Sequence, residues 1–171
     1  RLPQKDFSRL YQLARRYAAE RRYAPAAEAL VQMVRRDAAL LTAWVRQEAA
    51  ITQVAVELGW SAGSLYQSRP QQAKDVWAAL CAAEPRDADI FNNLGLVARD
   101  LGAFEESWRA YEKALALQPD NANLLNDGAV ILHYYLHRDY DKCQEMYERA
   151  IEISTALLEQ PETLTPDQKA A

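Results

Sequence analysis

The stretch ADIFNNLGLVARDLGAFEESWRAYEKALALQPDN, from Ala88 to Asn121, decides the fold of this chain. It reads as one complete helix-turn-helix unit, and the neighbouring segments repeat its landmarks. Pro85 and Pro119 stand one such unit apart, and each comes just after a helix. A fixed period of this length indicates helical hairpins that stack on one another, because each unit needs a neighbour to bury its apolar face.

The landmarks within the unit identify its family. The segment 88–91 returns as 122–125 at the same offset, and Gly95 returns as Ala129. A Leu-Gly pair, a small residue, an aromatic residue, an Ala and a Pro at these spacings resemble the tetratricopeptide family. The residues that carry this resemblance are Leu94-Gly95, Tyr111, Ala114-Leu115 and Pro119. The resemblance implies an all-α, right-handed solenoid of about four antiparallel helix hairpins, whose inner face holds other chains.

We expect a single domain that spans residues 1–171. Its approximate units are 7–40, 41–87 with an insertion, 88–121 and 122–158, followed by a linker and the start of a further helix in 159–171. The last segment contains Thr165-Pro166-Asp167-Gln168, which is typical of a helix start.

The second unit is longer than the others. The separation from Trp44 to Ala73 exceeds that of the matching pair, Phe91 and Ser107, by thirteen positions. We expect a long first helix over about 40–58 that breaks near Gly59, where small residues permit a break. Trp60 in this insertion is either an exposed anchor or a cover for the apolar side of the hairpin. The fourth unit is also longer, by two positions within 137–140.

Composition excludes several classes of protein. Half of the residues are hydrophobic, which is ample for a continuous core, and no apolar run is long enough to span a membrane. The two cysteines, Cys81 and Cys143, fit packing positions in second helices. The sequence lacks a phosphate-binding loop and the hydrolase and metalloprotease motifs, so we expect no enzyme activity and no cofactor. It does not assign a compartment, although the cytoplasm is favoured.

The charge is unevenly distributed. Residues 1–50 contain ten Lys and Arg against five Asp and Glu, a net +5, and residues 51–171 contain ten against nineteen, a net −9. The basic doublets are Arg15-Arg16, Arg21-Arg22 and Arg35-Arg36. They indicate a solvated helical face first, and a docking patch for an acidic partner or an RNA backbone second. Nearby Tyr11 and Tyr17 fall at core spacing, which argues against nucleic-acid binding.

Candidate binding residues follow from the resemblance, since the first helix of each hairpin lines the inner face in this family. They are Asn92, Asn93, Leu96, Arg99, Asn123, Asn126, Asp127, Val130, His133 and Tyr134. An Asn amide has both an acceptor and donors, so a row of Asn can pair with the backbone of an extended peptide. The alternative is that these Asn residues cap and solvate helix starts.

The same positions narrow the choice of partner. One subclass of the family clamps the C-terminal carboxylate of chaperones with Lys and Arg, but the corresponding residues here are Asp89 and Asn93, then Asn123 and Asp127. Chaperone tails are therefore not expected, and a neutral or basic peptide fits better. The function that we predict is a protein-interaction module or adaptor that binds a peptide segment of a partner in its concave groove. Assembly with other copies, or regulation within a larger protein, is the alternative.

A metal site is the weakest of the alternatives that we consider. His133 and His137 stand at positions i and i+4, and Asp139 and Cys143 follow them. Two His at this spacing can share one face of a helix, but the set matches no established metal motif. A partly exposed polar face is the better explanation of these residues, so we expect no metal site.

Overall fold

The computed structural model describes residues 3–47, 65–83 and 85–159. Its elements in chain order are α1 (Pro3–Ala19), α2 (Tyr23–Gln47), α4 (Leu65–Ser68), α5 (Pro70–Ala83), α6 (Ala88–Asp100), α7 (Phe104–Leu117), α8 (Ala122–Val130), the π-helix η1 (Ile131–Leu136) and α9 (Tyr140–Glu159). The expected break at Gly59, the side chain of Trp60 and the helix start at Thr165 lie outside the described residues.

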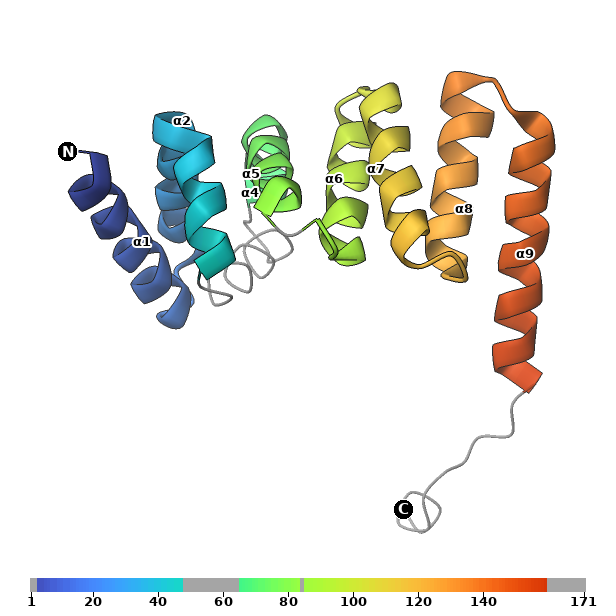
Figure 1. The fold of residues 1–171 in the computed structure, drawn as a ribbon, viewed down its shortest axis with the longest axis horizontal. Coiled ribbons are helices and arrows are strands. Elements are labelled where there is room, and N and C mark those ends of the chain that lie inside the picture. The colour runs from blue at the N-terminus through green and yellow to red at the C-terminus, as the bar shows by residue number, and fades with distance from the viewer. Residues whose placement is uncertain (1–2, 48–64, 84, 160–171) are drawn as a thin grey trace, which may run out of the picture.

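The helices stack in chain order, as Figure 1 shows from the N-terminal end to the C-terminal end. Tight packing pairs α1 with α2, α6 with α7, and α8 with α9, while α2 packs on α5, and α5 on α6. Each hairpin thus contacts its neighbours along the chain. The arrangement confirms the predicted all-α solenoid of antiparallel hairpins.

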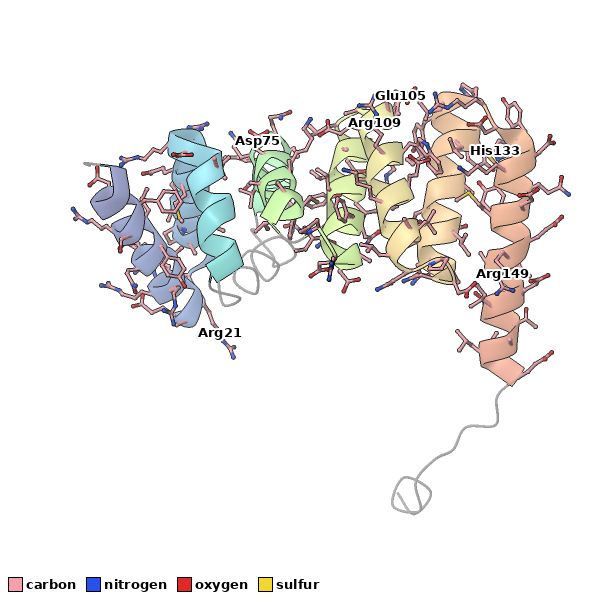
Figure 2. All side chains as sticks on the ribbon, viewed as in Figure 1. Arg21, Asp75, Glu105, Arg109, His133 and Arg149 are labelled. Carbon is pink, nitrogen blue, oxygen red and sulfur yellow. The ribbon has the colours of Figure 1, made fainter. Side chains whose placement is uncertain are left out.

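The helix α2 consists of two helical segments that meet at Asp37. The backbone of Asp37 is extended (φ −165°, ψ 95°), so the helix changes direction there. The first segment pairs with α1, and α2 also packs on α5. The turn between α1 and α2 contains Arg21 in a left-handed conformation (φ 54°). Figure 2 shows its side chain pointing away from the helices.

The starts of α6 and α8 use the same local chemistry. The side chain of Asp87 accepts hydrogen bonds from the N–H groups of Asp89 and Ile90. Asn121 does the same for Asn123 and Leu124. Each cap satisfies donors that have no partner inside the helix, which fixes where the helix begins.

A close contact between α6 and α7 sets the geometry of the hairpin that decided the fold. A Cβ atom on Gly95 would lie 2.9 Å from Cε2 of Tyr111, whose side chain is fully buried. The hydroxyl of Ser107 donates to the carbonyl oxygen of Gly95 at 2.7 Å. Only a residue without a side chain lets the two helices approach this closely. Gly102 in the intervening turn has φ +74°, a conformation that glycine adopts without strain.

The fourth hairpin has a different connection. The helix α8 continues as the π-helix η1, and His137 and Asp139 then adopt left-handed conformations (φ 51° and 52°). A π-turn contains more residues than an α-turn, so η1 and this connection take up the two added residues. The guanidinium of Arg138 bonds both carboxylate oxygens of Glu105 at 2.9 and 3.0 Å, which ties the connection to α7.

Candidate protein-binding surface

The candidate residues of α6 are only partly accessible. Asn93 is buried, with 5% of its surface exposed, so it belongs to the packing of the solenoid rather than to an open surface. Asn92 and Leu96 are half-buried, and Leu96 packs against the core. Arg99 is half-buried and bonds the carboxylate of Asp100 at 2.9 Å. This helix therefore exposes only parts of its candidate side chains, and its two Asn residues do not form a row of accessible amides.

The same Asp100 carboxylate fastens α4 to α6. The hydroxyl of Tyr66 donates to Oδ2 of Asp100, while Arg99 holds the other oxygen. Burial, and then this hydrogen bond, raises the pKa of Tyr66 to about 12. The phenol therefore stays protonated and remains a donor at neutral pH. Arg99 is held inside this cluster, which reduces its freedom to bind a partner.

The candidate residues of α8 are more open. Asn123 and Asn126 are exposed, and Asp127 and Val130 are half-buried. Asn123 and Asn126 line the same hollow of about 470 Å³ between α8 and α9. The amide of Asn126 donates to Asp127 at 3.4 Å, a long and weak bond. The structure thus brings together two of the four Asn residues predicted to form a row.

The opposite wall of this hollow was missed by sequence reasoning. It consists of residues from α9, namely Tyr147, Ala150, Ile151 and Ser154. Ile151 is 65% exposed, although it fits the apolar pattern of the second helix. The prediction considered only first helices as binding elements. The exposed Ile151 becomes visible only when the neighbours of α9 are known.

A second hollow of about 270 Å³ lies between η1 and α9. Its lining is formed by His133, Tyr140, Cys143, Gln144, Tyr147, Glu148 and Ile151. Figure 2 places His133 between the last two helices of the stack. Tyr134, the neighbour of His133 and a predicted site residue, is 61% exposed, and its ring lies 4.3 Å from that of His133. Tyr147 borders both hollows, so they form adjoining parts of one surface.

The apolar character of this surface continues along α9. In Figure 1 this helix projects beyond the other helices at its C-terminal end. Leu157 and Leu158 in the projecting part are 62% and 86% exposed. Exposed large apolar side chains that cluster on one element are typical of an interaction surface.

The basic doublets are partly neutralised by local partners. Glu20 pairs with Arg16 at 3.1 Å and with Arg22 at 3.4 Å, and Asp6 pairs with Arg36 at 3.0 Å. The tyrosines behave as predicted from core spacing, since Tyr11 is buried and Tyr17 packs against the core. These ion pairs are exposed and therefore weak, and they favour a solvated face for this end of the molecule.

Both cysteines are free and buried, as predicted for packing residues. Burial raises the pKa of the Cys81 thiol to about 12. Burial, and then the nearby Asp139 carboxylate, also raises the pKa of Cys143. A thiol with a raised pKa is a poor nucleophile at neutral pH, so neither residue has the character of a reactive cysteine.

Two further properties concern only the described part of the chain. Within residues 3–47, 65–83 and 85–159, no three His, Cys, Asp or Glu side chains are grouped to hold a metal ion. Of the helices in these ranges, none combines the length and the apolar character needed to cross a bilayer.

Comparisons with known proteins agree with this architecture. Residues 88–121 match the family described as tetratricopeptide repeat, so the chain contains such a repeat and the resemblance is confirmed. No curated protein matches the chain. Among solved structures, a crystal structure of MamA superposes with a TM-score of 0.61 at 20% identity, over 89% of this chain and 80% of that one.

Two further MamA structures give the same result. A double mutant of MamA RS-1 has a TM-score of 0.55 at 16% identity, over 89% of this chain and 96% of that one. MamA MSR-1 has a TM-score of 0.53 at 18% identity, over 88% and 98%. At these identities the likeness shows the fold alone. Solenoids of this type present extended surfaces along stacked helices, and such surfaces commonly bind other proteins.

Proposed function

The chain contains a tetratricopeptide repeat and folds as a solenoid, and on this basis we propose that it binds a peptide segment of a partner protein at the open side of α8. The observation that carries the proposal is the hollow of about 470 Å³, in which two exposed Asn amides face an apolar wall. Asn123 and Asn126 bond the peptide backbone, and Tyr147 and Ile151 contact its side chains. The module acts as an adaptor without catalysis.

The chemistry of the two walls supports this assignment. An Asn side chain has an acceptor oxygen and two donor hydrogens, so it pairs with the N–H and C=O of an extended chain whatever its sequence. The apolar wall adds a contribution of roughly 25 cal/mol for each Å² of apolar surface that a peptide covers there. Together the walls favour a segment with exposed backbone and apolar side chains on one side.

Peptides selected on the immobilised protein from a displayed random library provide the probe. We expect the double variant Asn123→Ala/Asn126→Ala to lower the affinity for the selected peptides by about tenfold, since two hydrogen bonds contribute about 1–3 kcal/mol in total. Gln71→Ala on α5 is the matched control, because it removes an exposed amide outside the hollow. Fluorescence anisotropy gives the affinities, and circular dichroism checks the fold. Unchanged affinity in the double variant would exclude the proposed role of these Asn residues.

A second candidate function is assembly of the protein with other copies. It is favoured by the exposed apolar side chains of Ile151, Leu157 and Leu158 on α9. Light scattering over a range of concentrations tests it, with Leu157→Glu/Leu158→Glu as the variant that should abolish any association. A monomer at every concentration would count against assembly.

A further inference from the structure

The hollow between η1 and α9, whose lining residues are given above, has aromatic walls. We refer to it as the aromatic hollow. The rings of His133 and Tyr140 meet edge to face with their centroids 5.7 Å apart. The ring of Tyr147 lies 6.1 Å from His133 at an angle of 64°. Tyr140 is 55% exposed, so its ring stands at the mouth of the hollow. Three π-systems therefore surround a space of about 270 Å³.

The charge around the hollow is negative. Glu148 is the charged residue of the lining, and Gln144 donates to its carboxylate at 2.8 Å. The lining, all of which is described, contains no Lys or Arg. Both basic residues of α9 are engaged elsewhere: Lys142 lies over the ring of Trp108 at 4.6 Å, and Arg149 bonds Asp120 at 2.9 Å. The hollow is therefore suited to a positive group.

Two polar atoms beside the hollow are buried without a hydrogen-bond partner among the described residues. They are Nδ1 of His133 and the hydroxyl oxygen of Tyr147. A buried polar atom without a partner destabilises the folded state. Both atoms can accept a hydrogen bond, but they are shielded from solvent, so a ligand in the hollow reaches them only if the surrounding side chains shift.

The connection between η1 and α9 determines where α9 begins beside the hollow. The π-helix places His133 toward α9, and the left-handed His137 and Asp139 reverse the chain so that α9 begins at Tyr140. The Arg138–Glu105 ion pair anchors this turn to α7. Local departures from α-helical geometry of this kind are frequent at functional sites.

We propose that the aromatic hollow binds the guanidinium group of an arginine on a partner protein. Guanidinium is planar, stacks on aromatic faces and presents five N–H groups, whereas the lysine ammonium is a compact and strongly hydrated charge. Glu148 at the rim pairs with the positive charge, and Tyr140 and Tyr147 provide the faces on which it stacks. The inference rests on the proposed function in one respect, namely that the ligand belongs to a protein.

The test uses a small probe, so it does not depend on knowing the partner. The probe is N-acetyl-arginine methylamide, titrated into the protein while NMR follows the ring signals of tyrosine and histidine. The matched control is N-acetyl-citrulline methylamide, which has the same shape without the charge. We expect saturable shifts with the arginine probe and at least about tenfold weaker binding of citrulline, from the loss of the cation–π and ionic contacts. Equal binding of the two probes would overturn the proposal.

Variants locate the binding of the probe. Tyr140→Leu should weaken it by about tenfold, and Glu148→Gln by about fivefold. Glu152→Gln is the control, because this carboxylate lies on the same helix but pairs with Arg149. An unchanged affinity in Tyr140→Leu, with a native circular dichroism spectrum, would exclude the aromatic hollow. A lysine probe that binds as tightly as arginine would exclude the preference for guanidinium.

The two proposals fail in different ways. Asn123→Ala/Asn126→Ala should reduce the affinity of selected peptides and leave the arginine probe unaffected, because these residues line the other hollow. If the probe does not bind but the peptides depend on the Asn pair, the proposed function stands and the arginine site does not. If the probe binds but the double Asn variant keeps its affinity for the peptides, only the proposed arginine site is supported.

Discussion

The hairpins α6–α7 and α8–η1–α9 share one sequence pattern but differ in what covers them. Equivalent positions of their second helices are offset by one repeat and the two added residues. Trp108 in α7 is 6% exposed, whereas its counterpart Gln144 in α9 is exposed. Leu115 is half-buried, whereas its counterpart Ile151 is 65% exposed. The face that is core in the third hairpin is therefore surface in the fourth.

The difference comes from the next element in the stack. A Cβ atom on Gly128 of α8 would lie 3.3 Å from the ring of Trp108 and 3.4 Å from Leu115, and Lys142 of α9 lies over the same ring. The fourth hairpin thus closes over the face of α7. Among the described residues, nothing closes over the corresponding face of α9, and both hollows lie there.

The largest expected effect comes from truncating the equivalent residues Trp108 and Gln144. Trp108→Ala should lower the free energy of unfolding by about 3–5 kcal/mol, because it leaves a cavity between two hairpins. Gln144→Ala should change it by no more than about 0.5 kcal/mol, because the side chain is exposed. Urea unfolding followed by circular dichroism measures both. Similar losses for the two variants would show that α9 is covered in solution as α7 is.

An intermediate effect is expected from adding a methyl group at two glycines of first helices. Gly95→Ala should lower the free energy of unfolding by about 1–3 kcal/mol, because the buried ring of Tyr111 cannot move away. Gly128→Ala should stay within about 1 kcal/mol of wild type, because its nearest contact is the flexible end of Met146, the Trp108 ring at 3.3 Å needs to move only slightly, and alanine favours the helix. Thermal unfolding of the two variants side by side is the measurement. A larger loss at Gly128 would mean that the fourth hairpin packs as rigidly as the third.

The smallest expected effect comes from the helix caps, where the two hairpins should not differ. Asp87→Ala and Asn121→Ala should each lower the free energy of unfolding by about 1 kcal/mol, because each removes an acceptor for two N–H groups. Chemical denaturation of both variants gives the values. Equal losses for the two variants would show that the hairpins differ in their packing and not in their helix starts. Clearly unequal losses would show that the helix starts contribute to the difference.

The sequence predicted much of the fold and less of the site. The period, the Leu94-Gly95 pair and Tyr111 predicted a hairpin, and the structure shows this hairpin with a close contact between Gly95 and Tyr111 that the sequence did not specify. The prediction also selected Asn123 and Asn126, which share a hollow. It did not anticipate that Asn93 is buried, because the degree of burial depends on helices that are distant in the sequence.

The second wall of the site could not be inferred for a related reason. Tyr147 and Ile151 carry the ordinary apolar spacing of a second helix, so their pattern predicts core. The two added residues were a signal in the sequence that this hairpin is unusual. Their accommodation by a π-helix and two left-handed residues depends on how η1 packs against α7 and α9.

The sequence by itself determined the repeat, its helices and the residues that cap them, because periodicity and capping are properties of residues close together in the chain. The tertiary structure alone decided which apolar face stays open. Burial is a relation between elements, and identical patterns at Leu115 and Ile151 end in different environments because only the first has a further hairpin against it in the described chain.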